Sequence, residues 1–285
     1  MKAYLKLARP HHWIKNLLVL FPLMCSGQLL QWQRLSRGLW AFCAFSLLAS
    51  GIYCINDIRD RDKDQNNPSK CRRPVASGAV SVHGAGVFCG VLLILSLVCG
   101  YLAAGTEGLP WLWLGIYFVL NLGYSFGLKN YPLVDVAILA SGYLLRILYG
   151  GAVTDIELSK WLCLTVIAVS FYLGLGKRRG ELGTGGERKV LRYYSEQFLG
   201  YNMYLCVALA VVFYALWTVD PLTVSRAGGE ALIWTVPLVL LICMKYSLDL
   251  ESGSDGDPVE VLLRDKLILA MGLLLGLIIV GIIYL

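Results

Sequence analysis

Acidic residues with regular spacing interrupt the apolar sequence just after Asn56. Asp57, Asp60 and Asp64 lie three and four residues apart. On a continuing helix this spacing places the three carboxylates on one face, while Asp62 points away. Like charges at such a spacing repel one another, and Mg²⁺ is commonly bound by a few carboxylates together with phosphate oxygens. The pattern therefore predicts a magnesium site formed by the three aspartates.

A structural interpretation of the same residues is a solvated helix extension. In that interpretation Arg61 pairs back to Asp57, and Lys63 pairs back to Asp60. The position of the cluster argues against it, because the aspartates begin directly at the end of an apolar run. Charged groups at such a place are costly unless they serve a site.

Basic residues follow in two groups. They are Lys70, Arg72 and Arg73 after the second apolar run, and Lys177, Arg178 and Arg179, followed by Glu181, after the sixth. A guanidinium binds phosphate through two parallel hydrogen bonds and an ammonium binds it as a point charge, so both groups are candidate phosphate ligands. Taken singly they could equally be anchors that set the membrane topology. Their place on the same face as the aspartates favours ligands.

The fifth apolar run contains two charged residues. Asp135 and Arg146 are nearly three helical turns apart and project from the same side. Asp135 lies near the end that carries the aspartates and is a weaker candidate for the site. Arg146 lies deeper, and we expect it to pair with an acidic residue such as Asp155 or Glu157. The histidines His11, His12 and His83 show no metal-ligand spacing.

The rest of the sequence predicts a membrane protein. Of the 285 residues 57% are hydrophobic and only 15% are charged. The apolar residues fall in runs long enough to cross a bilayer core about 30 Å thick. The predicted fold is all-α, with nine transmembrane helices around a cavity in one domain, residues 1–285. The expected spans are approximately 16–33, 38–56, 84–104, 109–127, 133–152, 159–176, 199–218, 231–248 and 267–285.

The distribution of charge predicts the orientation. Most of the 25 Lys and Arg residues fall in the N-terminal arm and in the loops after the even-numbered spans. The positive-inside rule then places the N-terminus and the long polar loops 57–83 and 177–198 in the cytoplasm, and Leu285 outside. The first span lacks a small-residue cleavage site, so we expect it to be retained. The net charge of +6 is explained by this bias and by phosphate ligands rather than by nucleic acid.

The aspartate motif resembles that of the UbiA-type intramembrane prenyltransferase superfamily. Asn56, Asp57, Asp60 and Asp64 match all four positions of its N-D-x-x-D-x-x-x-D motif. The resemblance implies that these residues bind Mg²⁺ and the diphosphate of a substrate. It also implies a membrane enzyme whose cavity opens to the cytoplasm and sideways to lipid.

A narrower resemblance is to the decaprenyl-phosphate phosphoribosyltransferase subfamily. The matching residues are Arg9-Pro10, Trp13, Lys15-Asn16, Pro22, Lys70, Arg73-Pro74, Tyr124-Ser125, Lys129, Asp135, Ser141-Gly142, Arg146, Lys177-Arg178, Glu181, Asp249, Pro258, Glu260 and Asp265. In place of the second aspartate motif usual in prenyltransferases, the chain has a basic run that begins at Lys177. That departure puts a second magnesium-diphosphate site in doubt and suggests a pocket for a phosphate monoester.

This resemblance implies transfer of 5-phosphoribosyl from phosphoribosyl pyrophosphate to a polyprenyl phosphate, with release of pyrophosphate, in cell wall biosynthesis. The implied substrate-binding residues are Lys15, Asn56, Lys70, Arg73, Tyr124, Lys129, Asp135, Lys177, Arg178 and Glu181. Two other functions stay open: transfer of an isoprenoid from its diphosphate to an aromatic or other small acceptor, and membrane transport. A monomer and a homo-oligomer are both compatible with the sequence.

Overall fold

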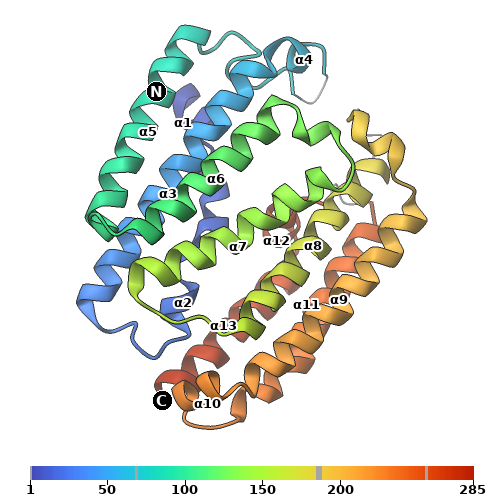
Figure 1. The fold of residues 1–285 in the computed structure, drawn as a ribbon. Coiled ribbons are helices and arrows are strands. Elements are labelled where there is room, and N and C mark those ends of the chain that lie inside the picture. Colours follow the sequence, from blue (N-terminus) through green and yellow to red (C-terminus); the bar gives the residue numbers. More distant parts are fainter. Residues whose placement is uncertain (1, 68–69, 184–187, 254–255) are drawn as a thin grey trace.

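The protein is a bundle of long helices (Figure 1). Many large apolar side chains are exposed on these helices. The computed structural model describes residues 2–67, 70–183, 188–253 and 256–285. Eight helices in these ranges are long and apolar enough to cross a membrane. They are α3 (Trp32–Arg59), α5 (Val82–Ala104), α6 (Gly108–Phe126), α7 (Val134–Thr154), α8 (Lys160–Gly183), α9 (Glu196–Thr218), α11 (Val236–Glu251) together with the preceding η4 (Ala231–Thr235), and α13 (Lys266–Tyr284).

Shorter helices connect the long ones. They are α1 (Lys2–Ala8), η1 (Pro10–Val19), α2 (Phe21–Met24), α4 (Arg61–Gln65), η2 (Leu128–Asn130), η3 (Lys189–Tyr193), α10 (Pro221–Ala227) and α12 (Pro258–Arg264). The all-α fold expected from the sequence is confirmed. The two polar loops end at side-chain caps, because Ser81 Oγ accepts a bond from the Gly84 amide at the start of α5 and Ser195 Oγ accepts one from Phe198 at the start of α9.

The first expected span, residues 16–33, is not a continuous α-helix, and the prediction of nine regular spans differs from the structure there. The segment is broken into η1 and α2. Pro22 contributes to the break, since proline lacks an amide hydrogen and clashes with the preceding turn. The tighter 3₁₀ helix rises about 2 Å per residue, so it covers the same depth with fewer residues.

Polar bonds nevertheless align this broken segment along α3. Trp13 Nε1 donates to Ser50 Oγ at 3.0 Å, and Asn16 Nδ2 donates to Ser46 Oγ at 3.0 Å. On its other side the segment packs tightly against α7. A Cβ atom at Gly150 would lie 1.9 Å from the carbonyl oxygen of Val19, so this contact requires glycine.

Two clusters of buried apolar residues lie on either side of the bundle. One contains residues of η1, α3, α5, α6 and α7 and is centred on Phe45 and Tyr149. The other contains residues of α7, α8, α9, α11 and α13 and is centred on Tyr172 and Tyr246. Helices α7 and α8 pack together between these halves (Figure 1).

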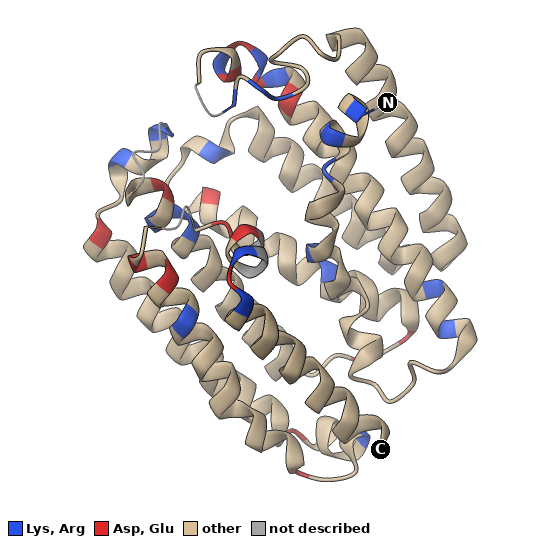
Figure 2. Ribbon diagram, turned by 180° about the vertical axis from the view of Figure 1, so that it is seen from behind, with Lys and Arg blue, Asp and Glu red and all other residues tan. Residues whose placement is uncertain are grey.

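Charged residues gather at one end of the bundle, where α4, η2, η3 and α12 lie (Figure 2). The N-terminal helix lies at this end, since Lys6 Nζ donates to the Arg72 carbonyl oxygen at 3.3 Å. The C-terminus lies at the opposite end, where the Tyr284 hydroxyl donates to the Leu23 carbonyl oxygen at 3.3 Å. The N-terminal helix and the C-terminal residues therefore lie at opposite ends of the bundle (Figure 1).

Candidate active site

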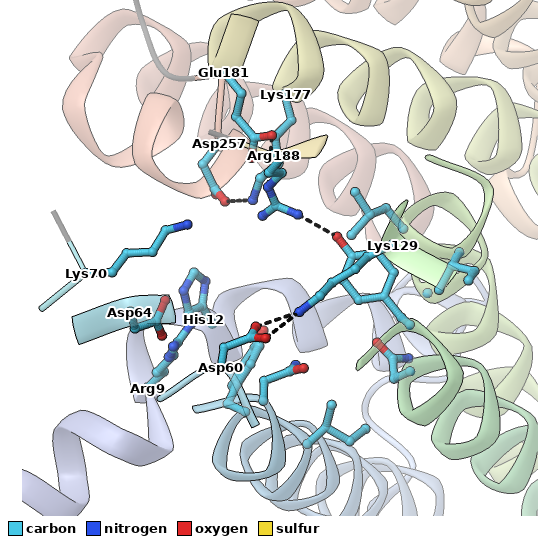
Figure 3. A pocket seen from close by; sticks show the side chains of 18 of the residues that line it. Arg9, His12, Asp60, Asp64, Lys70, Lys129, Lys177, Glu181, Arg188 and Asp257 are labelled. Carbon is cyan, nitrogen blue, oxygen red and sulfur yellow. Dashed lines mark hydrogen bonds and ion pairs between the residues drawn. The ribbon is translucent and has the colours of Figure 1, made fainter. Parts of the chain in front are cut away.

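A cavity of about 900 Å³ lies at the charged end, between the two halves of the bundle (Figure 3). The predicted site residues that line it are Lys15, Asn56, Asp60, Asp64, Lys70, Arg73, Tyr124, Lys129, Lys177 and Glu181. Asp57, Asp135 and Arg178 are buried and are not among the lining residues.

The carboxylates come from the turn in which α3 passes into α4. The amide of Asp64 donates to the Asp60 carbonyl oxygen at 2.8 Å, so the helical spacing continues through this turn. Asp60 and Asp64 consequently face the same cavity, whereas Asp62 is exposed. Asp57 lies one turn deeper, is 1% exposed and does not line the cavity, so two of the three predicted ligands face it.

Each of the three aspartates contacts a cation from another part of the chain. Lys129 Nζ lies 2.6 Å from Asp60, and Arg73 lies 2.7 Å from Asp64 (Figure 3 shows the Lys129 contact). Arg9 lies 2.6 Å from Asp57. The local pairing of the helix-extension interpretation is therefore wrong. Gly127, with φ of 135°, ends α6 and allows the turn that brings Lys129 to the aspartates.

The environment of Asp57 indicates whether the three aspartates suit a metal ion. Its Oδ2 atom is buried and has no hydrogen-bond partner, although a buried carboxylate oxygen normally has one. An oxygen of this kind beside Asp60 and Asp64 fits a hard cation such as Mg²⁺. Among the described residues no group of three ligands is already assembled, so binding requires the carboxylates to exchange their present cationic partners.

A second group of cations, the basic wall, lines the opposite side of the cavity, where Asp257 and Glu181 pair with two of them. Lys177 Nζ lies 2.6 Å from Asp257, and Arg188 donates to the Tyr124 hydroxyl at 3.0 Å (Figure 3). Lys70 extends into the same space from the loop after α4. Burial, reinforced by the neighbouring Arg188, lowers the pKa of Lys70. A bound anion would relieve that shift, so this wall suits phosphate.

Arg178 and Asp135 form a buried pair behind the wall, although both were predicted to bind substrate. Both side chains are 0% exposed, and Arg178 Nε lies 2.5 Å from Asp135 Oδ2. Arg178 also donates to Glu181 at 2.6 Å and to Tyr124 at 3.2 Å. The pair holds these two lining residues in place. Consecutive residues on α8 differ by about 100° in direction, which turns Arg178 inward while Lys177 faces the cavity.

Several lining residues were not predicted. Arg9, His12, Arg188 and Asp257 all face the cavity. Arg9 was part of the sequence resemblance, and Arg188 belongs to the basic loop after α8. Local spacing gave no reason to select His12 or Asp257, because their neighbours in space are distant in sequence.

The expected partner of Arg146 is also wrong. Asp155 pairs with Arg37 at 2.8 Å, at the opposite end of the bundle. Arg146 instead donates to Asn16, Gly142 and Tyr117, and it lines the deep part of the cavity. Its helix position turns it towards the interior rather than towards the nearest acidic loop.

A cavity lined by charged side chains of both signs, among helices long and apolar enough to cross a membrane, is typical of a membrane-embedded transferase. The sequence model of the UbiA prenyltransferase family matches residues 18–262. The chain belongs to that family. Its fold is similar to a UbiA homolog from Archaeoglobus fulgidus bound to GPP and Mg²⁺, with a TM-score of 0.73 and 18% identity over 98% of this chain and 97% of that one.

Curated relatives are similar along nearly the whole sequence. A decaprenyl-phosphate phosphoribosyltransferase from Corynebacterium glutamicum is 34% identical, and the aligned region covers 94% of this chain and 83% of the relative's length. The proteins of the same name from Mycolicibacterium smegmatis and Mycobacterium tuberculosis are each 33% identical over 94% of this chain. The aligned regions cover 88% and 90% of the lengths of these two relatives. The predicted membership and the class of membrane transferase are confirmed.

Proposed function

We propose that this chain transfers the 5-phosphoribosyl group from phosphoribosyl pyrophosphate to a polyprenyl phosphate and releases pyrophosphate, with Mg²⁺ as cofactor. The observation that carries the proposal is that one cavity brings the aspartates together with a second group of cations, Lys70, Lys177 and Arg188. This donor brings a diphosphate and a distant 5-phosphate, and the acceptor brings a third phosphate. The near-full-length similarity to decaprenyl-phosphate phosphoribosyltransferases supports the same reaction.

Asp57, Asp60 and Asp64 would hold the metal, with Asn56 as a neutral contact. Bound there, Mg²⁺ would stabilise the negative charge that develops on the leaving pyrophosphate. Arg73 and Lys129, which now neutralise Asp64 and Asp60, would move to phosphate oxygens when the carboxylates take the cation. The acidic wall thus fixes the leaving group.

The basic wall positions the remaining phosphates. Lys70, Lys177 and Arg188 would bind them, while Tyr124 and Glu181 are held by Arg178. A lipid phosphate oxygen forms the new bond to C1 of the ribose as the bond from C1 to pyrophosphate breaks. A phosphate monoester has a second pKa near 6, so the attacking group is largely ionised and needs no general base.

The orientation of the protein in the membrane is part of this function. The charged end, with the N-terminus and the cavity, would face the cytoplasm, and the C-terminus would lie outside the cytoplasmic membrane. The concentration of Lys and Arg at that end supports this orientation. Residues 1–285 would act as one domain, and a lateral opening between helices would admit the isoprenoid tail. Self-association into a homo-oligomer is compatible with this arrangement.

The test is reconstitution with alternative substrates. Purified protein with Mg²⁺, phosphoribosyl pyrophosphate and a polyprenyl phosphate should release pyrophosphate and form a phosphoribosylated lipid, detected by mass spectrometry. A prenyl diphosphate with an aromatic acid should form no product. Reaction of the second mixture alone would reject phosphoribosyl transfer and favour isoprenoid transfer.

A further inference from the structure

Arg146 is a buried cation that contacts no carboxylate among the described residues. It lies in the middle of α7 and is 5% exposed. Its Nε donates to Asn16 Oδ1 at 2.7 Å, one terminal nitrogen donates to the Gly142 carbonyl oxygen at 2.6 Å, and the other donates to the Tyr117 hydroxyl at 3.4 Å. A guanidinium has five N–H donors, so two have no partner in these contacts.

Arg178 differs from Arg146 in its charged partners. Arg178 is also buried in a membrane-spanning helix, but Asp135 and Glu181 both contact it. Removing a cation from water without a counter-charge is strongly unfavourable. The faces of Phe45 and Tyr117, with centroids 4.8 Å and 5.3 Å from the Arg146 guanidinium carbon, offset only part of that cost.

The surroundings of Arg146 are prepared for a ligand. The residue lines the cavity, together with Tyr143 and Ile138 on its own helix. Asn16 Nδ2 donates to Ser46 Oγ, and this bond turns the Asn16 side-chain oxygen towards Arg146. Asn16 thus orients the guanidinium but adds no negative charge.

Depth separates this place from the aspartates. The Asn16 contact lies at the level of Ser46 on α3, and Asp57 lies eleven residues further along the same helix. At 1.5 Å per residue the backbone separation is about 16 Å. A ligand at Arg146 is therefore a different group from the one bound by the carboxylates.

We propose that Arg146 is the centre of a second anion site, deep in the cavity, that takes a phosphate monoester. The inference rests on the proposed function in that both candidate groups, the lipid phosphate and the ribose 5-phosphate, belong to its substrates. Both have the same chemistry, a dianion that a guanidinium binds through two parallel bonds. Aromatic and aliphatic walls beside the cation suit a phosphate that carries an apolar or a sugar substituent.

Binding without turnover tests the site. The probes are farnesyl phosphate and ribose 5-phosphate, titrated calorimetrically into the full-length protein in detergent without Mg²⁺. At least one probe should bind wild type, and Arg146→Gln should weaken its affinity by about 10-fold or more. The probe that loses affinity identifies the source of the phosphate. Failure of both probes to bind wild type, or unchanged affinity in Arg146→Gln, would overturn the proposal.

Two further variants separate ligand binding from structural support. Arg146→Lys keeps the charge but loses the two parallel donors, so its affinity for the probe should lie between those of wild type and Arg146→Gln. A purely structural role would instead make Arg146→Lys as harmful to thermal stability as Arg146→Gln, with no specific loss of probe binding. Arg37→Gln, at the opposite end of the bundle, is the matched control and should leave both affinities unchanged. Phosphoribosyl transfer is assayed separately, so an inactive wild type that still binds a probe through Arg146 would reject the proposed function and retain the site.

Discussion

The cavity aspartates are neutralised by cations that are themselves candidate phosphate ligands. Arg73 contacts both Asp57 and Asp64, and Lys129 contacts Asp60. In a magnesium diphosphate, Mg²⁺ can bind the aspartates and the diphosphate oxygens can bind the arginine and lysine. Each present ion pair is then replaced by one contact to the metal and one to the diphosphate. This exchange lets a buried charged site remain compensated with and without substrate.

The metal assignment predicts a large effect of one carboxylate. Asp60→Asn should lower turnover by about 100-fold or more at saturating Mg²⁺, because an amide oxygen is a poor replacement for an ionised ligand. Asp62→Asn is the matched control, since that side chain is exposed, and it should retain near-normal turnover. Pyrophosphate release measures both. Similar rates for Asp60→Asn and wild type would refute the assignment.

The basic wall predicts a change in substrate affinity. Lys177→Gln should raise a substrate KM by about 10-fold, the scale expected for loss of a charge-assisted contact worth roughly 1.5 kcal/mol or more. Arg61→Gln removes an exposed cation near the same end of the bundle and should leave KM unchanged. If both variants had normal KM but altered topology, the role of Lys177 would be that of a membrane anchor.

The neighbouring Arg178 should respond differently. Arg178→Gln leaves Asp135 buried without its cation, which is expected to cost about 3 to 5 kcal/mol of stability. Lys177→Gln should cost less, because its pair with Asp257 is partly exposed. Thermal unfolding in detergent compares the two variants. Wild-type stability of Arg178→Gln together with a raised KM would instead make Arg178 a direct ligand.

At the scale of elements, the broken N-terminal segment depends on close contact with α7. Gly150 supplies that contact beside Val19, and the same segment carries Arg9, Lys15 and Asn16 into or beside the cavity. The register of η1 against α3 and α7 therefore determines part of the site. A helix with larger residues at this contact would hold the segment farther away.

Two glycine substitutions test this dependence. Gly150→Ala should destabilise the protein by about 1 to 3 kcal/mol, because the added methyl group overlaps the Val19 backbone. Gly90→Ala, on α5, meets no atom within 4 Å and should be neutral or slightly stabilising, since alanine favours helix. Thermal unfolding measures the difference. Equal stability of the two variants would contradict the close packing of η1 on α7.

At the scale of the whole molecule, the two ends of the bundle have different charge. The end with the cavity carries most of the cations, and the other end carries Arg37 with its partners Glu107 and Asp155. In the proposed orientation, the cavity would open on the side that supplies soluble phosphoribosyl pyrophosphate, while the acceptor would reach it from the bilayer.

Accessibility to a membrane-impermeant thiol reagent tests the orientation. Asp62→Cys, in the exposed turn of α4, should gain label over the parent chain only in inside-out vesicles. Trp32→Cys, where the native side chain is 75% exposed at the other end, should gain label in intact cells. The opposite pattern would invert the proposed topology, and labelling of both from one side would contradict the transmembrane arrangement.

Local sequence was sufficient for the helical fold and for one wall of the site. Apolar runs of membrane-spanning length predicted the long helices, since an isolated helix in lipid must satisfy its own backbone bonds. The spacing of Asp57, Asp60 and Asp64 predicted their common side, because side-chain direction within a helix follows residue number. Within the described ranges, the first expected span is broken near Pro22, and the span expected at 231–248 begins with the 3₁₀ helix η4.

Tertiary structure decided which charges meet. Arg9 and Asp57 are 48 residues apart in the chain, and Lys129 and Asp60 are 69 apart, so no local spacing could pair them. Packing also placed Lys177 in the cavity and Arg178 behind it, and left Arg146 without an acidic partner among the described residues. A sequence determines the faces of each helix through its period, but the rotation and contact of one helix against another depend on how all the side chains between them pack.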